Sequence, residues 1–312
     1  MLAGPAATER AGSAAAIELP EHGVLAGYGC GEQGPYLVID DLSRAPWQRQ
    51  VIFIRDRVLT FSRRDERHCS GRHDLETGRS IPCPDQVRLG SVHEQCGACF
   101  AATGFNPAFY NAPQVSPQQR KRNLEPHVVY LVSFGRGALK VGITYAPRRL
   151  SRLLEQGARL GVVIAHMPNA DLARELEASI VQGFDVAESV RAAKKRQLLG
   201  IPLALPAARD ELRTMLERVA ASHPSVDRHA PIEELDRHYF GAQPLPSTIT
   251  DLSETLPHCI SGRCLGMIGD VLVAAQGERR FMLSLGDSVA HRIQLETRQR
   301  ENRFVGQLGL PF

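Results

Sequence analysis

The feature that most constrains the fold is a long stretch, from Ser62 to Leu124, in which apolar residues show no helical or strand periodicity. Pro, Gly, His, Arg and Cys dominate this stretch, and it is too long for an ordinary loop inside a compact domain. We therefore expect something other than a hydrophobic core to hold it. Four of its cysteines follow a Cys-x13-Cys-x12-Cys-x2-Cys pattern: Cys69, Cys83, Cys96 and Cys99.

This cysteine pattern predicts a structural zinc site. A tetrahedral Zn²⁺ takes thiolate ligands at about 2.3 Å, and a Cys-x-x-Cys turn lets two thiolates converge. A closed site of four thiolates has no open coordination position, so we expect it to stabilise the fold rather than to catalyse. Only one of the two pairs has the short spacing, so a histidine could replace one cysteine; the candidates are His68, His73 and His93. The alternatives are a redox pair at Cys96 and Cys99 or ordinary loop thiols.

The composition of the chain is that of an ordinary globular protein. Its 312 residues, 43% hydrophobic and 23% charged, suffice for one large domain or several small ones. An odd number of cysteines, seven, without a recognisable export signal argues against a disulfide framework. No apolar run approaches the roughly 20 residues that span a bilayer. We expect a cytoplasmic protein without membrane contact and with a disordered start over residues 1–18; the sequence does not predict its oligomeric state.

The two ends of the chain carry strand signals. Apolar runs separated by Gly, Asp and Pro predict a β-rich module over residues 19–61 and another over residues 243–312. Each module has a Gly-x-x-x-Gly pair before an apolar run, and this echo suggests that the two ends pair into one sheet or barrel. The echoed features are Gly23 and Gly27 before Tyr36–Ile39, and Gly262 and Gly266 before Phe281–Leu285.

Between these ends we expect a cysteine module over residues 62–124, a mixed domain over 125–202 and a helical segment over 203–242. Periodicity in the mixed domain predicts strands at Val128–Phe134, Leu139–Thr144 and Val162–His166, and helices at Pro147–Gln156, at Asp171–Gln182 and ending near Leu199. In the helical segment after this domain, apolar residues at helical spacing predict an amphipathic helix that packs on the core. They are Leu212, Met215, Leu216 and Val219. The expected fold class is α+β, with a small mixed sheet and flanking helices.

The mixed domain contains a candidate site. Tyr130 and Lys140 lie on neighbouring predicted strands joined by a Gly-containing turn, so a hairpin would place them side by side. Gly142 would let a backbone or a substrate approach closely. On the helix that follows, leucines face the core and a polar face can present cations to a phosphate. The leucines are Leu150, Leu153 and Leu154, and the polar face comprises Arg149, Arg152 and Gln156.

These motifs resemble a known superfamily. The sequence VVY, followed after nine residues by KVGIT, then by a helix with arginines and a later glutamate, resembles the GIY-YIG nuclease superfamily. The run HVVYL…LKVGIT…R…EQGA, with a cysteine module just upstream, is more closely similar to an uncharacterised bacterial family, the domain of unknown function 2797. This resemblance covers roughly Cys69 to Gln182, and it implies a GIY-YIG-like fold without an established function.

The resemblance also implies roles for individual residues. Tyr130 would help to activate an attacking water, and Arg152, or else Arg149, would stabilise charge on a phosphate. Glu177, or else Glu175, would hold a divalent cation such as Mg²⁺ or Mn²⁺. Glu177 is favoured because we expect Leu172, Leu176 and Ile180 to take the core face of this helix, with Glu177 beside that face. Phosphodiester cleavage needs such a water, a cation at the developing charge and a Lewis acid at the leaving oxygen.

Two departures from the superfamily pattern keep catalysis an open question. Lys140 stands where the superfamily has a second tyrosine, and Arg191 stands where an asparagine is expected. A lysine with an ordinary pKa of about 10.4 is a poor base, although it can bind phosphate as a point charge. The hypotheses are a metal-dependent phosphodiesterase acting on DNA or RNA, a non-catalytic nucleic-acid-binding or regulatory protein, and a protein acting on a small phosphorylated or acylated metabolite.

Basic residues gather around the candidate site. The net charge of +3 is too mild to require a polyanionic partner, so their placement decides whether they form a phosphate-binding stripe or solvated faces. The three groups are Arg120–Arg122, Arg148–Arg152 and Arg191–Arg196. The expected nucleic-acid contacts are Arg148, Arg149, Lys194, Lys195 and Arg196. No role is assigned to His127, Cys30, Cys259 or Cys264.

Overall fold

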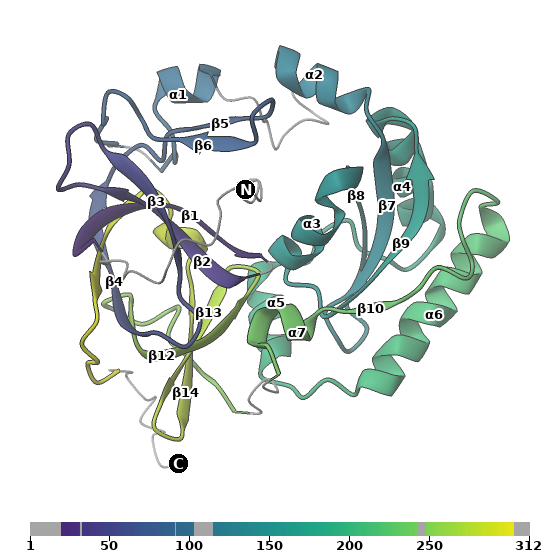
Figure 1. Ribbon diagram of the computed structural model, residues 1–312. Coiled ribbons are helices and arrows are strands. Elements are labelled where there is room, and N and C mark those ends of the chain that lie inside the picture. Colours follow the sequence, from purple (N-terminus) through teal and green to yellow (C-terminus); the bar gives the residue numbers. More distant parts are fainter. Residues whose placement is uncertain (1–19, 32, 91, 103–114, 243–247, 303–312) are drawn as a thin grey trace, which may run out of the picture.

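Turn residues divide the apolar runs at both ends of the chain into strands. The computed structural model (Figure 1) describes residues 20–302 except 32, 91, 103–114 and 243–247. The expected disordered start, residues 1–18, lies outside the described residues. The first strands are β1 (His22–Gly31), β2 (Gly34–Asp41), β3 (Gln48–Phe53) and β4 (Val58–Arg67). The last are β11 (Thr250–Asp251), β12 (Cys259–Ile268), β13 (Val271–Gln276), β14 (Arg279–Ser284) and β15 (His291–Glu296), with a 3₁₀ turn η2 (Gly286–Ser288) before β15.

These strands form one nine-stranded sheet in the order β11-β14-β13-β12-β4-β15-β1-β2-β3. The sheet is mixed, because β11 runs parallel to β14 while the other neighbours are antiparallel. Leu25, Phe61, Phe281 and Leu295 belong to one buried apolar cluster between its strands. The two ends of the chain therefore share a sheet, as the sequence echo predicted.

The sheet is built from two copies of one four-stranded unit. Strands β1 to β4 and β12 to β15 have the same internal pairing, and the units exchange strands through the pairs β1–β15 and β12–β4. Each first strand carries a bulge at the same place, between Leu25 and Gly27 and between Cys264 and Gly266. The antiparallel pair β4–β15 then lies on an approximate two-fold axis that relates the units.

Backbone details repeat with the units. Asp56 and Ala290 both precede the last strand of their unit with a positive φ, 61° and 65°. The Asp56 amide donates to Cys264 O at 2.9 Å, and the Ala290 amide donates to Leu25 O at 2.8 Å. One part of the predicted repeat was wrong, because the sequence matched the run Tyr36–Ile39 with the run Phe281–Leu285. Tyr36–Ile39 lies in β2, whose counterpart in the second unit is β13. Phe281–Leu285 instead begins in β14, the counterpart of β3.

The second sheet has the order β10-β9-β7-β8 with antiparallel pairs. Its strands are β7 (His127–Ser133), β8 (Leu139–Tyr145), β9 (Leu160–Met167) and β10 (Glu233–Glu234). The accompanying helices are a 3₁₀ turn η1 (Ala146–Arg148), α3 (Arg149–Gln156), α4 (Ala170–Gly183), α5 (Ala192–Leu199), α6 (Leu205–Ser222) and α7 (Asp236–Phe240). The strands and helices predicted from periodicity are confirmed here, with shifts of a few residues at their ends.

Helices cover both faces of this second sheet. Leucines and isoleucines of α4 and α6 pack with Val129 and Leu131 of β7 in one core. Helix α3 lies on the opposite face, between the second sheet and the nine-stranded sheet (Figure 1). The expectation that Leu172 faces the core was wrong: its side chain is 42% exposed, and Ala173 is buried instead. No helix among the described residues is both long and apolar enough to cross a membrane.

The end of α3 is where the two sheets meet. Helix α3 terminates at Gly157, whose φ of 72° is the left-handed conformation that suits glycine at a helix end. A Cβ on Gly157 would lie 3.2 Å from the backbone N of Gly269, in the β12–β13 turn, so the two backbones are in direct contact. The buried Tyr239 hydroxyl of α7 donates to Ala158 O at 2.8 Å. These contacts fix α3 against the nine-stranded sheet.

The cysteine segment forms short elements above the nine-stranded sheet. They are β5 (Arg72–Asp74), β6 (Arg79–Ile81), α1 (Gly97–Ala102) and α2 (Pro117–Asn123). Helix α2 connects this segment to the second sheet. Its Arg122 donates to Leu75 O beside β5 and lies 4.1 Å from the ring centre of Tyr145 on β8.

Candidate functional site

The four cysteines of the predicted zinc site come together. Their Sγ atoms all lie within 4.8 Å of one another, and those of Cys83 and Cys96 are 4.0 Å apart. In an ideal tetrahedral zinc site with bonds of about 2.3 Å, the sulfur atoms are about 3.8 Å apart. The cluster therefore has the size of a four-thiolate metal site and is too wide for a disulfide. In the described part of the chain, no histidine joins it.

Local backbone geometry orients these thiols. The amides of Gly71 and Cys96 donate to Cys69 Sγ at 3.4 and 3.2 Å, and the Cys99 amide donates to Cys96 Sγ at 3.5 Å. Burial raises the pKa of Cys69 to about 11, whereas the Cys99 amide lowers the pKa of Cys96. A bound cation would stabilise all four thiolates, because a metal-coordinated thiol loses its proton.

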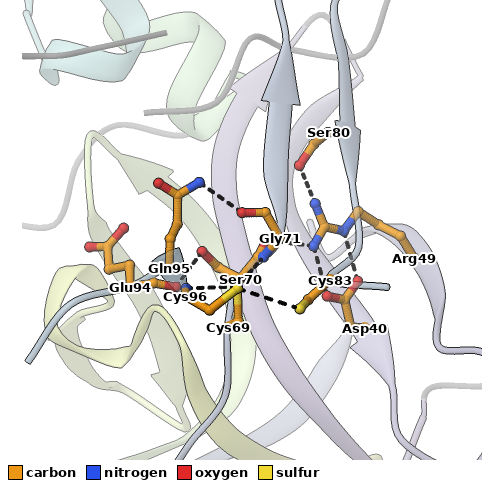
Figure 2. A network of polar contacts seen from close by, with 10 residues as sticks. All are labelled: Asp40, Arg49, Cys69, Ser70, Gly71, Ser80, Cys83, Glu94, Gln95 and Cys96. Carbon is orange, nitrogen blue, oxygen red and sulfur yellow. Dashed lines mark hydrogen bonds and ion pairs between the residues drawn. The ribbon is translucent and has the colours of Figure 1, made fainter. Parts of the chain in front are cut away.

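A buried ion pair ties the cysteine segment to the nine-stranded sheet (Figure 2). Arg49 of β3 donates to both carboxylate oxygens of Asp40 of β2 at 2.7 Å, and also to Ser70 O at 2.7 Å. Its other terminal nitrogen donates to Ser80 Oγ. Gly71 requires a glycine, because its φ is 81° and a Cβ would lie 2.0 Å from Ile81 O. The cysteine cluster is thus held by polar contacts where an apolar core is lacking.

The second candidate site centres on Tyr130, which is 1% exposed. Tyr130 on β7 pairs with Gly142 on β8, and a Cβ on Gly142 would lie 2.4 Å from the Tyr130 hydroxyl oxygen. The space expected above Gly142 for a substrate is therefore occupied by the Tyr130 side chain. Arg152 of α3 is hydrogen-bonded to Tyr130, although burial raises the Tyr130 pKa overall.

Lys140 lies on the same face of β8 as Gly142, and its side chain is 8% exposed. The hairpin that was expected to bring Tyr130 and Lys140 together is present, with the two residues offset by two positions. Residues beyond α4 run along β8, where the Val141 amide donates to Ala187 O at 3.1 Å. Lys140 Nζ donates to Glu188 O in this segment. Burial lowers the Lys140 pKa.

Glu177 of α4 is electrostatically coupled to the same group. It is 9% exposed, and burial raises its pKa to about 7, opposed by the nearby charges of Lys140, Arg174 and Arg152. Glu177 in turn raises the pKa of Lys140 and of Tyr130. The four residues inferred from the resemblance therefore lie close enough to affect one another's proton affinity. In the described residues, Glu177 belongs to no group of three metal-ligating side chains.

Arg152 is held in place by its own helix. Its guanidinium lies 3.5 Å from the Glu155 carboxylate. With the Gln156 amide oriented to accept, Arg152 Nε and Nη2 donate to its oxygen at 3.1 and 2.8 Å. The expected polar face of α3 thus forms one network around Arg152.

Four of the five expected nucleic-acid contacts have partners within the protein. Arg148 pairs with Glu155 and Arg149 with Glu233, while Arg196 lies 3.1 Å from Asp251 and 3.4 Å from Glu254. Lys195 points back toward α3, where its Nζ donates to Gln156 O at 2.6 Å. Lys194 is exposed. The acidic partners of Arg149 and Arg196 come from distant parts of the chain, so the sequence clusters alone could not reveal these pairs.

The residues without an assigned role are buried or partly buried. His127 Nδ1 is 2.8 Å from Glu125 O, and burial lowers the His127 pKa. Cys30 and Cys264 are buried in strands, where desolvation raises their pKa to about 12, and Cys259 accepts from Ser62 Oγ at 3.3 Å. None of the three joins the four-cysteine cluster.

Fold and site define a strand-rich, mixed α/β protein with a four-cysteine cluster that could hold a structural metal ion. The chain belongs to the family described as "Protein of unknown function (DUF2797)", whose model matches residues 92–284. The match includes Cys96, Cys99 and the whole second sheet. Comparisons with curated proteins and with solved structures found no match.

Proposed function

We propose that the protein binds the phosphates of nucleic acid at Lys140 and Arg152, on a GIY-YIG-like core stabilised by a structural zinc. One observation carries this proposal: Lys140, Arg152 and the half-buried Lys195 lie close enough to influence one another's charge, and Arg152 is hydrogen-bonded to the buried Tyr130. Arg152 lowers the pKa of Lys140, and both cations lower the pKa of Lys195. A bound anion would stabilise the charged forms of these clustered groups.

The zinc part of the proposal rests on the chemistry of the ligands. Four thiolates within 4.8 Å of one another would favour Zn²⁺ over harder cations, which prefer oxygen. The site would contribute folding energy to a segment whose elements are too short to build a core. Its loss should therefore disorder the segment and α2, which docks on it through Arg122.

Binding is tested with single-stranded, duplex and branched DNA and RNA across a salt series. We expect affinity that falls with salt, and at least a tenfold loss of affinity in Lys140→Ala and Arg152→Ala. Arg149→Ala is the matched control, since Arg149 lies on the same helix but is paired with Glu233. Equal affinity for all three variants, or no binding at low salt, would refute the proposal.

A second candidate function is metal-dependent phosphodiester cleavage, which the raised Glu177 pKa favours. A carboxyl with a pKa of about 7 can accept a proton at neutral pH, or it can bind Mg²⁺ or Mn²⁺ once deprotonated. A single carboxylate fits Mg²⁺, which keeps several waters and is often completed by substrate phosphates. Lys140, in the position of the second tyrosine, would then hold the phosphate and not act as the base.

Cleavage is tested by incubating the same nucleic acids with Mg²⁺ or Mn²⁺. We expect product from the unmodified protein and at least a hundredfold slower cleavage by Tyr130→Phe and Glu177→Gln, with Glu175→Gln as the control on the exposed side of α4. Product formed at equal rates by all of these proteins would indicate a contaminating nuclease and reject the assignment.

A further inference from the structure

The chain uses lysine sparingly. It contains four lysines and 33 arginines. Arginine serves wherever a permanent positive charge suffices, whereas lysine has an amine that can lose its proton and act as a nucleophile. Two of the four lysines, the buried Lys140 and the half-buried Lys195, lie near enough to Arg152 to feel its charge. Lys121 and Lys194 are the exposed ones.

Lys195 is held in an unusual environment for a lysine. Its Nζ donates to Gln156 O at 2.6 Å and lies 4.6 Å from the ring centre of Phe134. No carboxylate in the described part of the chain forms an ion pair with it. The charged groups that face it are Asp270 from the nine-stranded sheet, Lys140 from β8 and Arg152 from α3.

These surroundings favour the neutral amine. Burial is the main cause that lowers the Lys195 pKa to about 8; Asp270 opposes this shift, and the charges of Lys140 and Arg152 add to it. An amine of this kind has roughly a hundred times more free base near neutral pH than an exposed lysine. Lys140, by contrast, has the Glu177 carboxylate beside it, which favours its charged form.

An opening lies next to this pair of lysines. A depression of about 330 Å³ is bounded by the β7–β8 turn, the segment before α5 and the first turn of α5. Leu139 and Lys194, which directly precede the two buried lysines in the sequence, contribute to its lining. Lys140 and Lys195 do not themselves line it, so a small molecule would reach the site from this side only after the Glu188 carbonyl releases Lys140 and the lining shifts.

We propose that Lys195 is a nucleophilic amine that forms a Schiff base with an anionic aldehyde or ketone. The neutral Nζ attacks the carbonyl carbon, and one Nζ proton moves to the carbonyl oxygen to give a neutral carbinolamine. A proton from solvent then converts the hydroxyl group into a leaving water, and its departure leaves a protonated imine. Arg152 and Lys140 bind the anionic group of the same molecule, and this second part of the inference rests on the proposed phosphate site.

The probe is pyridoxal 5′-phosphate, compared with pyridoxal, each followed by borohydride reduction of the imine to a stable secondary amine. Because the chain has only four lysines, peptide mass mapping assigns every adduct. At pH 7.5 and limiting reagent, we expect Lys195 to be modified at least ten times faster than Lys121 or Lys194, although it is less exposed. Pyridoxal 5′-phosphate should react faster than pyridoxal.

Matched variants separate the two parts of this inference. Lys195→Arg keeps the charge and should abolish the fast reaction, whereas Lys194→Arg should leave it unchanged; circular dichroism checks that both variants are folded. Arg152→Gln should remove the preference for the phosphorylated reagent without stopping the reaction of pyridoxal. The proposal would be overturned if the modification rates simply followed solvent exposure, so that Lys121 and Lys194 reacted at least as fast as Lys195. Fast modification of Lys195 without any preference for phosphate would leave the amine assignment standing and count against the phosphate site.

Discussion

The cysteine cluster and the lysine site hold their ionisable groups in opposite ways. The four thiols face one another, oriented by nearby amides, and a single cation would stabilise them all. Lys140, Lys195 and Arg152 are instead cations that lower one another's proton affinity. A cation would stabilise the first arrangement, whereas an anion would stabilise the second. Under the functions proposed above, the first site would hold a permanent metal ion and the second a ligand that binds and dissociates.

Removing one cysteine ligand should have the largest effect on the molecule. Cys99→Ser leaves three thiols, so we expect about one zinc per chain in the unmodified protein and none in the variant. The free energy of unfolding should fall by at least about 3 kcal/mol, because structural zinc contributes roughly 10 kcal/mol or more in small modules. Elemental analysis and denaturant unfolding measure both quantities. Cys259→Ser, outside the cluster, is the control, and a metal-free protein that folds normally would contradict the zinc assignment.

The next largest effect should come from filling the space over Gly142. In Gly142→Ala the new Cβ would meet the Tyr130 ring at 2.4 to 2.8 Å, and overpacking of this kind costs about 3 kcal/mol. Gly183→Ala is the control, since nothing lies within 4 Å of its Cβ position. Adding Tyr130→Leu should recover part of the loss, as chemical denaturation would reveal. If the cost is the same with and without the tyrosine ring, the two residues are not packed as described.

The cysteine site was more accessible to sequence reasoning than the lysine site. All four candidate metal ligands lie within one segment and follow a recognisable spacing. The alternation of apolar and polar residues was also clear enough to predict β7, β8, α3 and α4. The role of Lys195 depends on Phe134, Gln156 and Asp270, which come from three other elements. The pairs of Arg149 with Glu233 and of Arg196 with Asp251 also join distant residues, so the arginines looked free in the sequence. Leu172 was misplaced because Ala173 fills the core at that turn of α4.

Neutralising Glu177 should have a pH-dependent effect. Its pKa rises from 4.5 to about 7 on folding, so the native state binds this proton more tightly than the unfolded state does. The stability that this proton contributes is complete below about pH 4.5 and is lost as the pH rises through 7. Glu177→Gln lacks this loss, so we expect it to match the unmodified protein at pH 4.5 and to be about 3 kcal/mol more stable at pH 8.

The measurement for Glu177 is urea unfolding from pH 4.5 to 8 without added Mg²⁺ or Mn²⁺. Glu175→Gln, on the exposed side of the same helix, should show no such divergence with pH. A constant difference between Glu177→Gln and the unmodified protein across this range would mean that Glu177 is already ionised in the folded state. The charge of Lys140 and the neighbouring arginines would then fully offset the effect of burial on the Glu177 pKa.

Removing Arg149 should have the smallest effect, although it lies one turn from Arg152. Its ion pair with Glu233, at 2.8 Å, is half exposed, and exposed pairs contribute less than about 1 kcal/mol. A double-mutant cycle with Arg149→Ala and Glu233→Ala, read by unfolding at low and high salt, should give a coupling below this value that shrinks with salt. A larger, salt-independent coupling would show that Arg149 helps to fix the start of α3. In that case Arg149→Ala could not serve as the control for Arg152→Ala in binding experiments. Glu233 would then help to hold α3, and with it Arg152, in position.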